Sequence, residues 1–208
     1  GNSFNHVELA GAEEGGVLDI NRNTVMGDLT DSGEGAALNI GSGASLSVNG
    51  ASNLSSSTIQ GSGTLTLRDT LEISGTASLQ GGVLLDLAKD DDSTGTLDLG
   101  STSGSTVSGI GGEGTLKSAG GVLTVNTGNL GGGSVFSGTL EGRGQLNISG
   151  NAGQTFENVM TAAGSSWAVN STGLFNIRMG GTVDNPRANT ALTLSSLTLG
   201  DGSSTNLT

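Results

Sequence analysis

The sequence contains no cysteine and no tyrosine, and it has one tryptophan and four phenylalanines among its 208 residues. Without cysteine there is neither a disulfide framework nor a thiolate that could hold a metal or act as a nucleophile. Aromatic anchors, which usually fill the core of an antiparallel β-sandwich, are scarce as well. These absences exclude a disulfide-stapled fold and count against a sandwich.

Basic residues are few: seven Lys and Arg stand against 19 Asp and Glu, so the formal net charge at pH 7 is −12. Binding to nucleic acid or to anionic membranes needs Lys and Arg to meet phosphates, so we expect no nucleic-acid partner. No apolar run reaches 18 residues, and we expect no membrane insertion of this segment. The residues from Gly1 to Phe4 lack the features of a signal peptide, which indicates a chain already processed or excised.

Glycine, in contrast, is abundant, with 39 residues. Together with the hydrophobic residues it brings the apolar share to about half, the usual value for folded proteins, whereas charged residues make up only 12%. Disorder is therefore not expected. The length suits one sizeable domain, and we predict a single unit over residues 1–208.

A tripeptide of apolar, polar and apolar residues returns from one end of the chain to the other, bounded by Gly, Ser, Asn or Asp. Clear copies are residues 18–20, 38–40, 65–67, 85–87, 97–99, 146–148 and 175–177. The alternation predicts short strands with one inward face, in which the middle residue points outward. No glycine-free segment keeps a helical spacing of apolar residues, so no helix is predicted.

A second repeat joins these strands: an apolar residue two positions before a Gly-x-Gly, followed by another alternation. It occurs in residues 59–67 (IQGSGTLTL), 110–116 (IGGEGTL) and 136–148 (FSGTLEGRGQLNI). Glycine allows a turn with positive φ where a Cβ atom would clash. Because one such unit is too short to bury a core, it must stack on copies of itself, as in a solenoid.

Antiparallel barrels or sandwiches and the parallel β-helix both accept many short strands. The uniform Leu, Ile and Val at inward positions favour the β-helix, where each side chain lies on its equivalent in the next turn, about 4.8 Å away. We predict an all-β parallel β-helix of about ten turns, with Leu65, Leu146 and Ile148 facing inward. Loops that interrupt the turns are expected near 88–95, 128–134 and 183–189, the last of which holds the only proline.

The Gly-x-Gly-x-Leu repeats, with the sequence VFSG at 135–138 before one copy, resemble the passenger-associated repeats of Gram-negative autotransporters. The resemblance covers most of the chain, including the closing strands near 192–202. It implies a right-handed β-helix that forms a fragment of a passenger domain. It also implies a location at the bacterial cell surface, with attachment through an outer-membrane barrel that these residues do not contain.

Catalytic patterns are weak. His6 is the only histidine, and the string 30–33 (TDSG) lacks the first glycine of a serine-protease motif, so no Ser-His-Asp triad is expected. Residues 109–114 match G-x-G-x-x-G, but no helix is predicted after them, and nucleotide binding by this motif needs one. We therefore predict that the protein is not an enzyme. A polysaccharide-degrading β-helix with paired carboxylates stays open as an alternative, as does a spacer stalk without a ligand.

The candidate binding residues are the outward middle residues of the tripeptides: Asp19, Asn39, Asp86, Asp98, Asn147 and Asn176. If they share one face, they form a polar, acidic strip that accepts hydrogen bonds from sugar hydroxyls or from basic partners. We predict adhesion to a host glycan or matrix protein, or self-association with another copy. No cofactor and no metal site are expected, because the run from Asp90 to Asp92 lacks the ligand spacing of known calcium loops.

Overall fold

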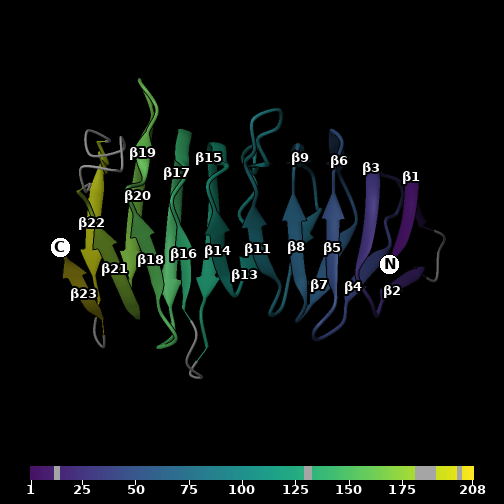
Figure 1. The fold of residues 1–208 in the computed structure, drawn as a ribbon, viewed down its shortest axis with the longest axis horizontal. Helices are drawn as coiled ribbons and strands as arrows, with labels where there is room; N and C mark the ends of the chain where they lie inside the picture. Colours follow the sequence, from purple (N-terminus) through teal and green to yellow (C-terminus); the bar gives the residue numbers. More distant parts are fainter. Residues whose placement is uncertain (12–14, 129–132, 181–190, 201–202) are drawn as a thin grey trace.

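The computed structural model describes residues 1–11, 15–128, 133–180, 191–200 and 203–208, and within these ranges the chain forms strands and no helix. Neighbouring strands pair in parallel and in register, and the strands stack along one long axis with the chain ends at opposite ends of it (Figure 1). The predicted all-β parallel solenoid is confirmed. No described residue belongs to a helix that is long and apolar enough to cross a membrane.

Each turn of the solenoid has three sides. The first side contains the N-terminal parts of β1 (Asn2–Gly11) and β3 (Thr24–Gly33), followed by β5 (Ser45–Val48), β8 (Thr64–Leu67), β11 (Leu84–Leu87), β14 (Gly109–Gly112), β16 (Ser134–Phe136), β18 (Gln154–Glu157), β21 (Leu174–Arg178) and β23 (Ser204–Leu207).

The second side contains the C-terminal parts of β1 and β3, followed by β6 (Ser52–Leu54), β9 (Thr70–Ile73), β12 (Thr96–Asp98), the first halves of β15 (Thr115–Asn126) and β17 (Thr139–Ser149), and β19 (Met160–Thr161). The third side contains β2 (Val17–Ile20), β4 (Ala37–Ile40), β7 (Thr58–Gly61), β10 (Ser78–Leu79), β13 (Ser105–Val107), the second halves of β15 and β17, β20 (Ser166–Ser171) and β22 (Ser196–Leu199).

About eight turns can be followed through all three sides, from β1 to β20, and the expected number of about ten is not confirmed. The loop predicted near 88–95 lies between β11 and β12 and carries an isolated antiparallel bridge between Lys89 and Thr94. Residues 129–132 of the segment predicted near 128–134, and the whole segment predicted at 183–189, lie outside the described residues.

The Gly-x-Gly repeat marks corners of the solenoid, and its three copies occupy three different corners. In each copy the first glycine has positive φ: 115° at Gly61, 85° at Gly112 and 77° at Gly142. The second glycine lacks room for a side chain, since a Cβ atom at Gly144 would lie 2.5 Å from the ring of Trp167. The repeat is therefore a local signal for turning a corner, and it does not say which corner is turned.

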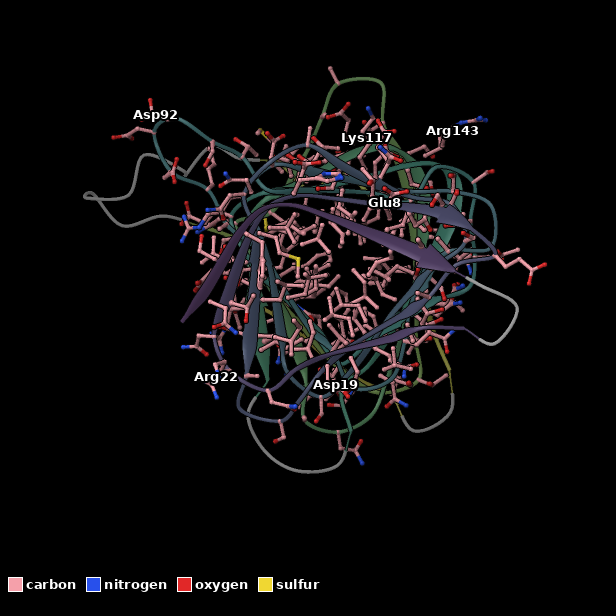
Figure 2. All side chains as sticks on the ribbon, turned by 90° about the vertical axis from the view of Figure 1, so that its right-hand side faces the viewer. Glu8, Asp19, Arg22, Asp92, Lys117 and Arg143 are labelled. Carbon is pink, nitrogen blue, oxygen red and sulfur yellow. The ribbon has the colours of Figure 1, made fainter. Side chains whose placement is uncertain are left out.

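The core fills the interior of the triangle (Figure 2), and its residues lie in ladders of equivalent positions. Leu65, Leu146 and Ile148 are buried, as predicted. Leu, Ile and Val fill most turns, whereas Phe136, Phe156 and Phe175 stack edge to face near the C-terminal end, with ring centroids 5.7 and 5.1 Å apart. Apolar burial of this kind is the main stabilising contribution in a repeat whose single turns cannot fold alone.

Candidate functional site

The six predicted binding residues do not share one side of the solenoid, so the single acidic strip considered from the sequence does not exist. The third side carries Asp19 (β2), Asn39 (β4) and Asn147 (β17), the first side carries Asp86 (β11) and Asn176 (β21), and the second side carries Asp98 (β12). The reason is that the tripeptide pattern separates inward from outward positions but contains no information about which of three sides a strand occupies.

These side chains do face outward, and several of them bond to the neighbouring turn. Asn39 Nδ2 donates to Asp19 Oδ1 at 2.9 Å, and Asn206 Nδ2 donates to Asn176 Oδ1 at 2.8 Å. Thr66 Oγ1 donates to Asp86 Oδ2 at 3.3 Å. Such ladders of amides and hydroxyls satisfy polar groups along the axis and contribute to stability without any ligand.

The third side carries one column of outward residues that are almost all amides or hydroxyls, and we call it the amide column. It consists of two stretches, because β10 is the last strand of a four-stranded sheet with β2, β4 and β7, and β13 belongs to the other sheet. The early stretch contains Asp19, Asn39 and Gln60, with Gln80 directly after β10. The later stretch contains Thr106, Thr124, Asn147, Asn170 and Thr198. Only Asp19 is ionisable. Three of the six predicted residues belong to this column, while the remaining members were missed, although Gln and Thr occupy the same outward place in their own strands.

Asn147 lies in a hydrogen-bonded group of amides in the amide column. Its Oδ1 accepts hydrogen bonds from Gln145 Nε2 at 2.9 Å and from Asn170 Nδ2 at 3.2 Å. The three amides come from two adjacent strands, β17 and β20, whose parallel register sets Asn147 directly beside Asn170. They form a pre-arranged group of polar side chains, half-buried and held by one another.

The second side has a different character, because its outward column is charged. The column runs Glu8, Thr30, Asn53, Glu72, Asp98, Lys117 and Glu141. Lys117 Nζ lies 3.4 Å from Asp98 Oδ2 and next to Glu141 in the register. Glu8 and Lys117 lie on the opposite side of the solenoid from Asp19 (Figure 2). The charged column and the amide column thus lie on different sides of the solenoid.

Charge is also unequal along the axis. Residues 1–114 contain 15 Asp and Glu and three Lys and Arg, whereas residues 115–208 contain four of each. The whole formal charge of −12 therefore belongs to the first 114 residues. Since salt screens charges beyond about 8–10 Å, a ligand on the later turns meets a nearly neutral surface.

Asp31 has a structural role that its place in the string 30–33 does not predict. Its carboxylate accepts hydrogen bonds from the backbone N–H groups of Ser55, Ser56 and Ser57 in the next turn, at 2.7 to 3.1 Å. Partial burial acts to raise the pKa of Asp31, but these N–H donors outweigh it and hold the pKa below its ordinary value. Asp31 is a cap for a corner of the solenoid.

The acidic loop after β11 is also organised by its own hydrogen bonds. Asp90 Oδ1 accepts from the Ser93 hydroxyl at 2.9 Å and from the N–H groups of Asp92 and Ser93 at 3.1 and 2.8 Å, which lower the pKa of Asp90. Arg68 Nη1 lies 3.4 Å from Asp90 Oδ2. Among the described residues no group of three or more His, Cys, Asp and Glu is placed to hold a metal ion.

The first turn leaves a cavity of about 570 Å³ at the N-terminal end, lined by Phe4, Val7 and Leu18 and edged by polar residues. His6 Nδ1 lies 2.5 Å from Asp28 Oδ2, and both side chains are exposed. Among the described residues that line this cavity there is no serine or cysteine. Elsewhere, the G-x-G-x-x-G string at 109–114 forms β14 and the corner into β15, so a strand follows it.

Comparison with known proteins found no matching family profile, no matching curated protein and no matching solved structure.

Proposed function

We propose that this solenoid is a structural and binding module of a bacterial surface autotransporter, acting in adhesion to host glycans or matrix proteins or in self-association between cells. The Gly-x-Gly corner repeat and the acidic, cysteine-free composition support this family. Membership of this family implies that the solenoid is right-handed. It also implies that the protein lies at the cell surface, attached through an outer-membrane barrel. The protein binds and does not catalyse.

The observation that carries the binding proposal is the amide column on the third side. Amides and hydroxyls both donate and accept hydrogen bonds, which matches the hydroxyl groups of a glycan. The column offers one such residue per turn, about 4.8 Å apart, so an extended chain of sugars can be contacted at several successive turns. Each contact is weak, and the affinity arises from their number. A glycan is therefore the partner that this surface fits best.

A spacer stalk is the second candidate, and a specific observation favours it. The outward amides bond to one another between turns, as Asn206 does to Asn176 on the first side. Such ladders stiffen a stalk even where nothing binds. The two functions predict different results when an amide pair is removed. Removal weakens ligand binding only if that side of the solenoid binds a ligand.

The test is a glycan and matrix-protein array probed with the parent chain and with two matched double variants. Asn147→Ala with Asn170→Ala removes a bonded amide pair from the third side, and Asn176→Ala with Asn206→Ala removes an equivalent pair from the first side. We expect the third-side variant to bind the best glycan at least about tenfold more weakly, since two hydrogen bonds of about 1 kcal/mol are lost. The first-side variant should bind like the parent.

An array without any bound ligand would favour the spacer. Equal binding by both variants would place the binding surface elsewhere. Release of shortened sugars from a bound polysaccharide would reveal the alternative, a polysaccharide-degrading enzyme, and would overturn the proposal that the protein does not catalyse.

A further inference from the structure

A groove of about 310 Å³ lies where the second and third sides meet, in the neutral later part of the solenoid. Its lining includes Gly120, Val122, Arg143, Gln145, Ser166 and Ser195. The parallel register sets Ala119, Arg143 and Ser166 beside one another in three successive turns, and it sets Val122 beside Gln145. The groove therefore runs across turns, directly beside the amide column.

Arg143 is the only cationic residue of the groove lining, and its side chain points out from the corner that follows Gly142 (Figure 2). Of the carboxylates that the structure describes, none lies within 4.0 Å of its guanidinium. A guanidinium presents two parallel N–H donors that match a carboxylate. An exposed arginine without such a partner is a ready receptor for an anionic group.

The neighbouring residues suit a sugar ring. Gly120 contributes no side chain, and a Cβ atom there would meet no atom within 4 Å, so the mouth of the groove is open. Gln145, Ser166 and Ser195 line the same groove as Arg143, with Ser166 beside Arg143 in the register, and Gln145 is itself bonded to Asn147 of the amide column. A ligand in the groove can therefore continue onto the column.

The surrounding charge permits an anion here and opposes it on the early turns. Residues 115–208 carry equal numbers of acidic and basic side chains, whereas residues 1–114 carry the entire net negative charge. An acidic polymer is repelled by the early turns and meets no net repulsion at the groove.

We propose that this groove binds a carboxylate-bearing sugar unit of a glycan, with Arg143 holding the carboxylate and with Gln145, Ser166 and Ser195 bonding to ring hydroxyls. The inference rests on the proposed glycan-binding function and adds the class of sugar. The ion pair between Arg143 and the sugar carboxylate gives preference for acidic over neutral sugars. The amide column binds acidic and neutral sugars alike.

The experiment compares the affinity of the protein for a uronic-acid oligosaccharide and for its methyl ester, which keeps the sugar and removes the charge. The parent should prefer the acid by at least about tenfold. Arg143→Gln should reduce that preference to within about twofold, mainly by weakening the binding of the acid, and Arg143→Lys should fall between because it keeps the charge and loses the fork. Arg178→Gln, which removes the same charge from β21 on the first side, should behave like the parent.

Several outcomes would overturn the inference. If the parent binds acid and ester equally, the groove does not select carboxylate, although the proposed glycan function stands. Arg143 is not the receptor if Arg143→Gln still prefers the acid over the ester. The same holds if Arg178→Gln removes this preference as strongly as Arg143→Gln does. If the parent binds neither oligosaccharide nor any glycan on the array, both proposals fail. Circular dichroism of each variant checks that the solenoid is intact.

Discussion

The early and the late turns of this solenoid have the same backbone but differ in core and in charge. In residues 1–114 the buried positions are mostly Leu, Ile and Val, and the surface carries the full net charge of −12. In residues 115–208 three phenylalanines and Trp167 enter the core, and acidic and basic residues balance. The solenoid thus requires apolar inward positions and glycine at corners, and it leaves outward chemistry free to vary along the axis.

Because of this difference, the binding properties of the surface depend on position both along the axis and around it. The acidic early part suits a cationic partner or none, because like charges repel at short range. The neutral late part holds the amide group around Asn147 and the groove with Arg143. A single description of the surface as acidic would hide this division.

The largest effect is expected from placing a charge in the core of either part. Leu65→Asp and Leu146→Asp each bury a carboxylate without a partner, and we expect a loss of at least about 4 kcal/mol in the free energy of unfolding. Leu65→Asp should lower the free energy of unfolding more than Leu146→Asp does, because it adds negative charge to the acidic part. Added salt should reduce the difference between the two variants. Urea unfolding followed by circular dichroism measures both.

The matched controls for this comparison are Thr66→Asn, which keeps a donor for Asp86, and Asn147→Asp, which keeps the acceptor oxygen, at outward positions one residue along each strand. Both should change stability by less than about 1 kcal/mol. Inward and outward substitutions with equal effects would show that the faces are assigned incorrectly. If Leu65→Asp and Leu146→Asp lowered the free energy of unfolding equally at low salt, the negative charge of residues 1–114 would have no effect on stability.

A smaller effect is expected from the cap at Asp31 in the acidic part. Asp31→Asn keeps one acceptor oxygen but loses the charge that holds three N–H groups, and we expect a cost of about 1 kcal/mol at pH 7 because the site is partly exposed. Asp91→Asn, in the loop after β11, removes an equal charge and serves as the control. Asp91→Asn should stabilise the protein slightly, because it only relieves charge repulsion. If Asp31→Asn stabilised the protein by the same amount, the carboxylate of Asp31 would contribute only repulsion and no cap.

The pKa of Asp31 also gives this cap a pH dependence. Because its pKa is lowered in the folded protein, its contribution is present above the ordinary carboxyl pKa of about 3.9 and is lost as the pH falls through the lowered value. The stability difference between the parent and Asp31→Asn should therefore shrink in acid. Urea midpoints from pH 7 downward measure it, and a constant difference would contradict the assignment.

Much of the fold could be predicted from the sequence, because alternation of apolar and polar residues is a local property. The inward placement of Leu65 and Leu146 and the corner role of Gly61 follow directly from it. The number of turns could not be obtained in this way. Strands such as β15 and β17 continue around a corner, so strand signals and turns do not correspond one to one.

The candidate site was only partly predictable for a related reason. Asn147 was recognised as outward, but its neighbours in space, Asn170 and Gln145, depend on the register between strands. Asp31 acts on residues 24 to 26 positions later, a separation set by the length of one particular turn. Interactions between turns need the register, and the register is a property of the folded stack.

The most direct test of the amide column follows its side-chain NH₂ signals by NMR while the best glycan from the array is titrated. Asn147 and Asn170 on the third side should shift in proportion to the bound fraction. Asn176 and Asn206, an equivalent bonded pair on the first side, serve as internal references that should stay in place. Shifts confined to the first-side pair, or equal shifts of both pairs, would contradict binding through the third side.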